Sequence, residues 1–158
     1  MAEPEKPLLF KRSHFTTRLP VDCVFNPSHF WAREREGGTW RVGFTKFATR
    51  MLGDMVDHDF EAKPGMAIEP GQILGWVEGF KAISDVYGFC SGEFIGVNPA
   101  LQKNITLINK KPYADGWLYE MTGTLDDKCV DAHGYAAILN QTIDKMLEQQ
   151  QAEKGTDI

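Results

Sequence analysis

The chain has 158 residues, of which 42% are hydrophobic and 25% are charged. The 17 Lys plus Arg residues stand against 22 Asp plus Glu residues, so the formal net charge is −5. This length and composition fit one globular domain and exclude a disordered acidic chain. The acidic balance argues against a nucleic-acid partner, which needs a basic surface. No apolar run approaches the roughly 18 residues that span a bilayer, so no membrane partner is expected.

Three cysteines, Cys23, Cys90 and Cys129, and four histidines show none of the close spacings that are typical of metal sites. We therefore expect no metal site. An odd number of cysteines without a pairing pattern favours free thiols in a reducing compartment. The first ten residues, MAEPEKPLLF, lack the apolar core of a signal peptide. The sequence therefore predicts a cytoplasmic protein.

Residues 1–20 carry three prolines and six charges with little periodicity, which predicts a flexible N-terminal extension. Residues 21–123 contain many short apolar stretches separated by Gly and Pro. Alternation at Trp40, Val42 and Phe44 predicts a half-buried strand, paired with 30–35 across a Gly-rich turn. Further strands are expected at 55–60, 73–80, 83–87 and 92–97. Two short helices are expected, one capped by Thr45 and one by Asn98. A mainly β sandwich or flattened barrel follows.

The C-terminal part of the chain has a different pattern. Thr124 begins a stretch that resembles a capping box, and apolar residues then recur at helical spacing up to Met146. We expect an amphipathic helix within 124–150, over roughly 127–149, that packs against the strands. Residues 151–158 are polar, which predicts a flexible tail.

The segment 75–87 contains the most informative lysine. Apolar strand residues run up to Lys81 and resume at Ile83, which places Lys81 and Ala82 at the tip of a tight hairpin. Two paired strands would hold this lysine while its stem points into solvent, so an enzyme could reach and modify its amine. Amide formation would remove the positive charge. On spacing alone, an ordinary solvated lysine remains the simpler interpretation.

An ordered series of short motifs extends from Pro27 to Glu120. Its members are Ser28-His29-Phe30-Trp31, Val42-Gly43-Phe44-Thr45, Leu52-Gly53-Asp54-Met55-Val56, Glu78 through Asp85, Ser91-Gly92-Glu93, Val97-Asn98 and Pro112-Tyr113-Ala114-Asp115-Gly116-Trp117-Leu118. In this order they resemble the H protein of the glycine cleavage system and related lipoyl carriers. The resemblance implies a hybrid lipoyl barrel-sandwich of two antiparallel sheets over residues 21–123, with short helices and a C-terminal helix.

The same resemblance implies that lipoic acid is attached to Lys81 through an amide bond. The motif around the attachment site comprises Glu78, Gly79, Phe80, Ala82, Ser84 and Asp85. Such a protein is a non-catalytic carrier without catalytic residues of its own, and the tether raises the effective concentration of its cargo at docked partners. Implied partners are a lipoate ligase or lipoyl transferase, dihydrolipoamide dehydrogenase, and either the glycine cleavage enzymes or a heterodisulfide-reductase-like complex.

The sequence departs from the H-protein pattern at Phe30, where the family usually has a glutamate that helps to hold the aminomethyl cargo. Phe30 lacks that charge and its hydrogen-bond acceptors, although Asp85 could still supply an acidic contact. Gly79-Phe80 also replaces the usual Ser-Val. These departures favour a sulfur-bound cargo in heterodisulfide-reductase-like sulfur oxidation. The alternatives are the H protein of glycine cleavage with an aminomethyl cargo, and an unmodified lipoyl-fold binding or regulatory module.

Cys90 is the one thiol that follows the hairpin closely in sequence. In a regular strand it would lie roughly 26 Å from the tip, at about 3.3 Å per residue. We therefore do not expect Cys90 to act as a resolving thiol for the lipoyl group.

Overall fold

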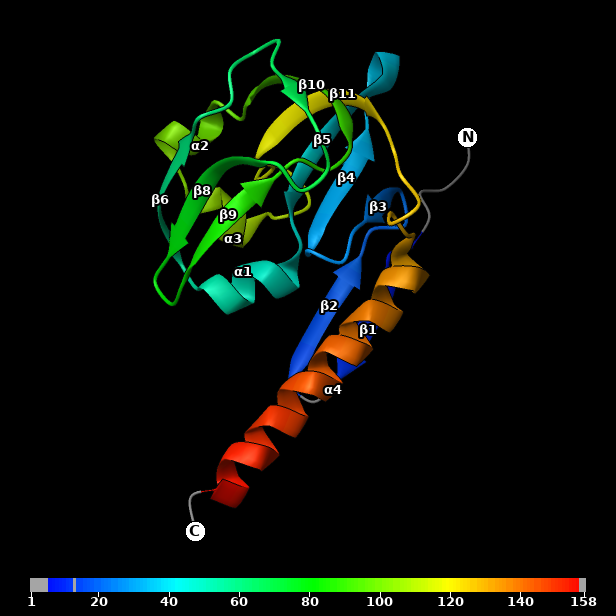
Figure 1. Cartoon of the computed structure of the whole chain (residues 1–158), viewed down its shortest axis with the longest axis vertical. Coiled ribbons are helices and arrows are strands. Elements are labelled where there is room, and N and C mark those ends of the chain that lie inside the picture. Colours follow the sequence, from blue (N-terminus) through cyan, green and yellow to red (C-terminus); the bar gives the residue numbers. More distant parts are fainter. Residues whose placement is uncertain (1–5, 13, 157–158) are drawn as a thin grey trace.

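The computed structural model describes residues 6–12 and 14–156, with side chains through Ala152. Two antiparallel sheets form the body of the molecule (Figure 1). The larger sheet has the order β3-β4-β5-β11-β10-β7, with strands Cys23–Phe25 (β3), Phe30–Glu34 (β4), Thr39–Phe44 (β5), Ala67–Ile68 (β7), Ser91–Val97 (β10) and Tyr119–Thr124 (β11). The smaller sheet has the order β6-β8-β9, with strands Met55–Phe60 (β6), Ile73–Gly79 (β8) and Ile83–Tyr87 (β9).

The main core lies between these two sheets. Phe44 and Tyr119 of the larger sheet share one buried cluster with Leu74, Val77 and Val86 of the smaller sheet. On β8, Leu74 and Val77 point into this core, and on β4 both Phe30 and its neighbour Trp31 are buried, because Trp31 belongs to a second cluster on the other face of the larger sheet. The mainly β architecture that the sequence predicts is confirmed.

The helices are short except for the last one. They are η1 (Glu36–Gly38), α1 (Lys46–Leu52), α2 (Ala100–Lys103), α3 (Leu107–Lys110) and α4 (Ala132–Thr156). The hydroxyl of Thr45 accepts a hydrogen bond from the Ala48 N–H at 3.4 Å, as expected of the cap of α1. The side chain of Asn98 accepts from the Ala100 N–H at 3.0 Å, so Asn98 also caps the turn that the sequence predicts.

The N-terminal segment differs from the flexible extension that its composition predicts. Leu8–Arg12 (β1) and Phe15–Leu19 (β2) form an antiparallel hairpin. Phe15, Thr17 and Leu19 on one face of β2 are buried, and the phenylalanine and the leucine join a second cluster with Tyr135 and Leu139 of α4. This alternation stabilises the strands only because α4, more than 100 residues away in sequence, covers them.

The C-terminal helix begins later and ends later than predicted. Residues before it pair with β3, since Val130 and Phe25 exchange two backbone hydrogen bonds of 2.8 Å. The chain turns at residues 127–128 and is then held by this bridge at Val130. The cap is instead Asp131, whose carboxylate accepts from the Gly134 N–H at 2.8 Å. The helix continues to Thr156, through most of the stretch expected to be a flexible tail.

A buried polar network joins α4 to the larger sheet. The hydroxyl of Tyr135 lies 2.8 Å from His29 Nδ1 and 2.8 Å from Thr45 Oγ1. His29 has a φ of 69°, in the left-handed region. Burial lowers the pKa of His29 to about 4, so the imidazole is neutral in the folded protein.

Candidate functional site

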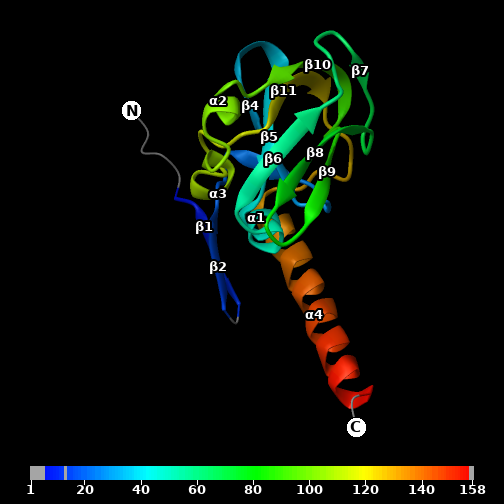
Figure 2. The ribbon, with the colours of Figure 1, turned by 90° about the vertical axis from the view of Figure 1, so that its left-hand side faces the viewer.

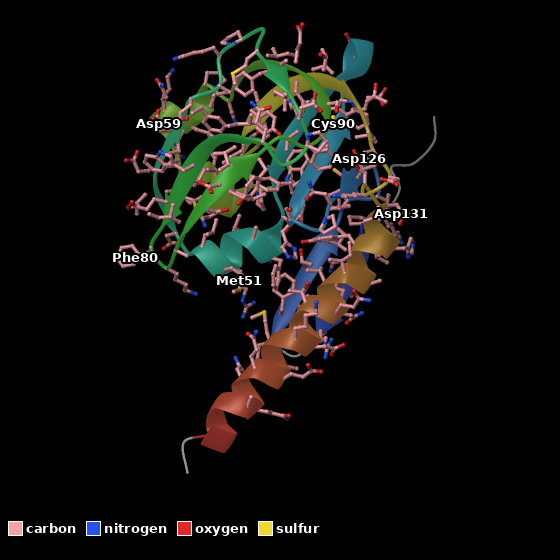
Figure 3. All side chains as sticks on the ribbon, viewed as in Figure 1. Met51, Asp59, Phe80, Cys90, Asp126 and Asp131 are labelled. Carbon is pink, nitrogen blue, oxygen red and sulfur yellow. The ribbon has the colours of Figure 1, made fainter. Side chains whose placement is uncertain are left out.

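Lys81 lies exposed in the turn that joins β8 and β9. The turn comprises Phe80, Lys81 and Ala82, and the Gly79 N–H closes it by donating to the Ala82 carbonyl at 2.8 Å. Phe80, beside the lysine, is 82% exposed. Phe80 marks this tip at one edge of the molecule in Figure 3. The structure thus agrees with the hairpin expected from the spacing, with a turn one residue longer.

The turn is fastened to the loop between α1 and β6. The Lys81 N–H donates to the Leu52 carbonyl at 2.8 Å, and the Phe80 N–H donates to the Asp54 carbonyl at 2.8 Å. The amides of Phe80 and Lys81 are therefore both occupied, which fixes the backbone that carries the lysine.

Two glycines allow this close approach. Gly53 ends α1 at a φ of 80°, and a Cβ atom built there would lie 3.0 Å from Lys81 Cγ. A Cβ atom on Gly79 would lie 2.1 Å from the Leu52 carbonyl oxygen. A Cβ atom at residue 79 would force a backbone shift, whereas one at residue 53 would be strained by the positive φ and would press on the lysine stem. The lysine stem therefore runs over the open surface of Gly53.

Asn109 of α3 holds the same loop from its other side. Its Oδ1 accepts from the Met55 N–H at 2.9 Å, and its Nδ2 donates to the Gly53 carbonyl at 2.9 Å. The sequence contains no local signal for this role, because only the tertiary fold brings residue 109 beside residues 53–55.

The remaining predicted motif residues lie on the two strands of the hairpin. Glu78 is half-buried and pairs with Asp57 on β6 and Ile83 on β9. Asp85 is half-buried and pairs with Trp76 on β8. Because paired residues share a face of a sheet, Glu78 and Asp85 lie on the same outer face.

Ser84 points to the opposite face of β9, and its hydroxyl donates to the Asp85 carbonyl at 2.9 Å. Among the residues with described side chains, no carboxylate forms an ion pair with Lys81. The ammonium group is therefore not held by a structural salt bridge.

Phe30 is a core residue rather than a lining residue of the lysine turn. It is 1% exposed and stacks on Phe44, with ring centroids 5.0 Å apart. Its ring also meets Tyr87 edge-on at 6.2 Å. The phenylalanine therefore fills space between the two sheets, and its presence is explained by packing.

The three cysteines are free and lack reactive character. Cys90 is fully buried, with its Sγ 3.9 Å from Met121 Sδ, and burial raises its pKa to about 11. Burial also raises the pKa of Cys23 to about 12 and that of Cys129 to about 11. A thiol that stays protonated at neutral pH is a poor nucleophile. Figure 3 shows Cys90 well away from Phe80 at the tip.

The described residues contain neither a candidate metal site nor a candidate membrane-spanning helix. Within that part of the chain, no group of three or more His, Cys, Asp or Glu residues could hold a metal ion. None of the described helices has the length and apolar character needed to cross a membrane.

Comparison with known proteins identifies the family. The family model for the glycine cleavage H-protein matches residues 23–150. A glycine cleavage system H protein from Corynebacterium jeikeium is 40% identical over 124 residues, which cover 77% of this chain and 97% of that protein. One from Bacteroides fragilis is 39% identical over 125 residues, covering 77% and 98%. The crystal structure of a glycine cleavage system H protein from Mycobacterium marinum superposes with a TM-score of 0.68 at 31% identity, covering 75% of this chain and 97% of that one.

These relatives overturn the expectation of a role in sulfur oxidation. They are named glycine cleavage system H proteins, and nothing in the comparisons supports a heterodisulfide-reductase-like complex as partner. The expectation depended chiefly on Phe30, whose side chain the structure places in the hydrophobic core.

The H protein is a non-catalytic lipoyl carrier subunit of the glycine cleavage system, with lipoic acid attached covalently to a lysine. It works with the glycine cleavage enzymes and a lipoate ligase. The match over residues 23–150 and the shared fold show that this chain belongs to the glycine cleavage H-protein family.

Proposed function

We propose that Lys81 carries the lipoyl group and that this chain transfers the aminomethyl group between the enzymes of glycine cleavage. One observation supports the assignment above all others: Lys81 is exposed on a turn whose backbone is fixed by two hydrogen bonds of 2.8 Å to the α1–β6 loop. A modifying enzyme can reach the amine, and the carrier can present the modified side chain from a defined position.

The residues around Lys81 fit a lipoyl group. The bare surface of Gly53 leaves room for the lysine stem, which a Cβ atom at 3.0 Å would crowd. Amide formation joins Lys81 Nζ to the carboxyl carbon of an activated lipoyl ester, with loss of a proton and the leaving group. When attached, lipoic acid supplies a dithiolane that can hold the aminomethyl group or accept two electrons.

Intact mass measurement tests the attachment site. The protein is produced in a host supplied with lipoate, beside Lys81→Ala and a control, Lys63→Ala, which removes another exposed turn lysine. We expect the wild type and Lys63→Ala to carry the lipoyl mass and Lys81→Ala to lack it. An unmodified wild type, under conditions that lipoylate a known carrier, would favour an unmodified binding or regulatory module instead.

Asp85 is the proposed acidic contact for the protonated amine of the cargo, since Phe30 supplies none. Asp59 offers a matched control, because Asp59 and Asp85 pair with Trp76 from opposite sides. Asp85→Asn should lower the fraction of carrier that glycine and the glycine cleavage enzymes load with the aminomethyl group, whereas Asp59→Asn should not. Equal loading of the two variants would remove Asp85 from the cargo site.

Dihydrolipoamide dehydrogenase and a lipoate ligase or lipoyl transferase remain the expected further partners. A reducing compartment such as the cytoplasm remains the prediction for location, which the three free cysteines support.

A further inference from the structure

A basic cleft lies where the N-terminal hairpin meets the barrel. Its volume is about 360 Å³, within the range of small-molecule sites, which begins at roughly 300 Å³. Arg18 of β2, Lys46 of α1 and Lys110 of α3 line it, and no carboxylate is found among its described lining residues. The composition gives no reason to expect such a group of cations, because the chain has a net charge of −5.

These three cations, Arg18, Lys46 and Lys110, have no charged partner of their own. All three are exposed, and none of them forms an ion pair within the part of the chain whose side chains are described. Cations gathered around one cleft focus a positive potential in it, because the surrounding protein has a low dielectric constant. The cleft therefore attracts an anion, and one with more than a single charge is favoured most.

A buried hydroxyl without a hydrogen bond belongs to the same cleft. Thr17 lines the cleft and is 3% exposed. Its Oγ1 is the one buried side-chain polar atom of the described residues without a hydrogen-bond partner. The Tyr113 hydroxyl interacts with Thr17, but the pair does not reach hydrogen-bonding geometry. Buried polar groups are almost always paired, so this hydroxyl beside three cations indicates a ligand oxygen that the protein does not supply.

Part of the cleft lies outside the shared carrier domain. Residues 16–18 of β2 form one wall, whereas the family model begins to match at residue 23. The relatives from Corynebacterium jeikeium and Bacteroides fragilis align over 97% and 98% of their own length within 77% of this chain. The cleft exists only because the added hairpin packs against the carrier domain, so it is a feature of this chain rather than of those relatives.

The cleft is separate from the lysine turn but is built on neighbouring elements. Lys46 begins α1 and Leu52 ends it, about 9 Å away at about 1.5 Å per residue. Asn109, whose amide holds the α1–β6 loop, also lines the cleft. Figure 2 shows the N-terminal hairpin beside α3, the helix that carries Asn109. A ligand in the cleft therefore leaves Lys81 accessible.

We propose that this cleft binds a small ligand through a phosphate group, independently of the lipoyl group. A phosphate monoester carries a charge of about −1.5 to −2 at neutral pH and has three strong acceptor oxygens. An arginine and two lysines match such a group, since both side chains are common phosphate ligands. A carboxylate carries only one negative charge and balances three cations less well. The missing partner of the Thr17 hydroxyl would be one of the phosphate oxygens.

An NMR titration of the unlipoylated protein tests this site. The backbone amides of Thr17, Lys46 and Lys110 report on the cleft, and that of Ile95 on β10 is a distant reference. Sodium phosphate is added at constant ionic strength and neutral pH, with sodium chloride as the comparison. The cleft amides should shift along saturable curves with phosphate alone. We expect a dissociation constant on the order of millimolar for so small a ligand.

A second titration with glycerol 3-phosphate distinguishes the two sources of a phosphate group. Tighter binding of this ester than of inorganic phosphate would identify the ligand as a phosphorylated small molecule. Equal binding would identify phosphate itself as the ligand.

A matched pair of lysine variants makes the test specific. Lys110 ends α3 and Lys103 ends α2, and both lysines are exposed at the end of a four-residue helix. Lys110→Gln should weaken phosphate binding about tenfold, because it removes a charge-assisted hydrogen bond. Lys103→Gln should change the dissociation constant by no more than about twofold.

Thr17→Val tests the unpaired hydroxyl separately. It should weaken phosphate binding about fivefold, because the hydrogen bond to the phosphate is lost. It should not lower the melting temperature of the free protein, in which this hydroxyl has no hydrogen bond to lose. A lower melting temperature with unchanged phosphate binding would remove Thr17 from the site.

The outcomes are independent of the modification of Lys81. Amide shifts that sodium chloride reproduces, or that fail to saturate with either phosphate, would overturn the proposed site. Equal weakening in Lys110→Gln and Lys103→Gln would show general attraction to surface charge and would overturn it as well. Saturable binding that Lys110→Gln weakens and Lys103→Gln leaves intact would support the site, whether or not Lys81 carries a lipoyl group.

Discussion

Replacement of Asn109 by alanine should make the lysine turn more mobile, although Asn109 hydrogen-bonds to the α1–β6 loop and not to the turn itself. The side chain makes two hydrogen bonds of 2.9 Å to the loop at Gly53 and Met55. Each is worth about 1 kcal/mol, and the buried Met55 N–H left without a partner adds a cost of about 1–2 kcal/mol. We expect Asn109→Ala to lower the free energy of unfolding by about 3–4 kcal/mol. The melting temperature should fall by about 6–16 °C for a domain of this size.

Asn98→Ala is the matched control for this variant. The Asn98 amide donates to the carbonyls of Asp115 and Trp117, both at 2.8 Å, and neither belongs to the lysine turn or to the α1–β6 loop. It should lose a comparable amount of stability while leaving the turn in place. The assay is the initial rate of lipoylation by a lipoate ligase, well below both melting temperatures and over a range of carrier concentrations.

At limiting carrier concentration, Asn109→Ala should be lipoylated about fivefold more slowly than the wild type. This factor corresponds to about 1 kcal/mol of the lost free energy having held the turn in its position. Most of the change should appear in KM, since the amine itself is intact. Asn98→Ala should stay within about twofold of the wild type. If both variants slow equally at matched fractions folded, the effect is one of global stability and Asn109 does not position the turn.

Three further predictions concern the core and the turn. His29 has a pKa of about 4 in the fold against about 6.5 unfolded, so stability is complete above pH 6.5 and is lost as the pH falls toward 4. Urea unfolding should show that the free energy of unfolding falls by about 2 kcal/mol between pH 7 and 5. His29→Asn should remove this pH dependence, since asparagine tolerates the positive φ. The same pH dependence in the variant as in the wild type would contradict the assignment to His29. Gly79→Ala should lower the free energy of unfolding by about 1–3 kcal/mol and slow lipoylation. Gly96→Ala is the control, because nothing lies within 4 Å of the added Cβ atom. Equal effects of the two variants on the rate of lipoylation would count against the close approach at the turn. Phe30→Glu should lower stability by about 3–5 kcal/mol, because it places an unpaired carboxylate against Phe44; an unchanged melting temperature would show that Phe30 is not the core residue described here.

Local patterns predicted most of the strands and the lysine turn. The alternation at Trp40 and Phe44 and the interrupted apolar run around Lys81 correspond to β5 and the β8–β9 turn. Both signals act over a few residues, since strand alternation has a period of two and a turn is specified by the residues at its tip. The resemblance of the ordered motifs added the family, which the comparisons confirm.

Contacts between distant segments decided the rest. The alternation on β2 became a stable hairpin because α4 covers it, and Val130 delayed the start of α4 by pairing with β3. Tertiary packing also places Asn109 against the α1–β6 loop and the side chain of Phe30 in the core, and no local sequence pattern encodes either position. The sequence by itself predicted a turn at Lys81 between two strands and, through its ordered motifs, the family of the protein. Only the tertiary structure decided what holds that lysine in place and which cations line the cleft beside the N-terminal hairpin, because both depend on segments joined by burial rather than by sequence neighbourhood.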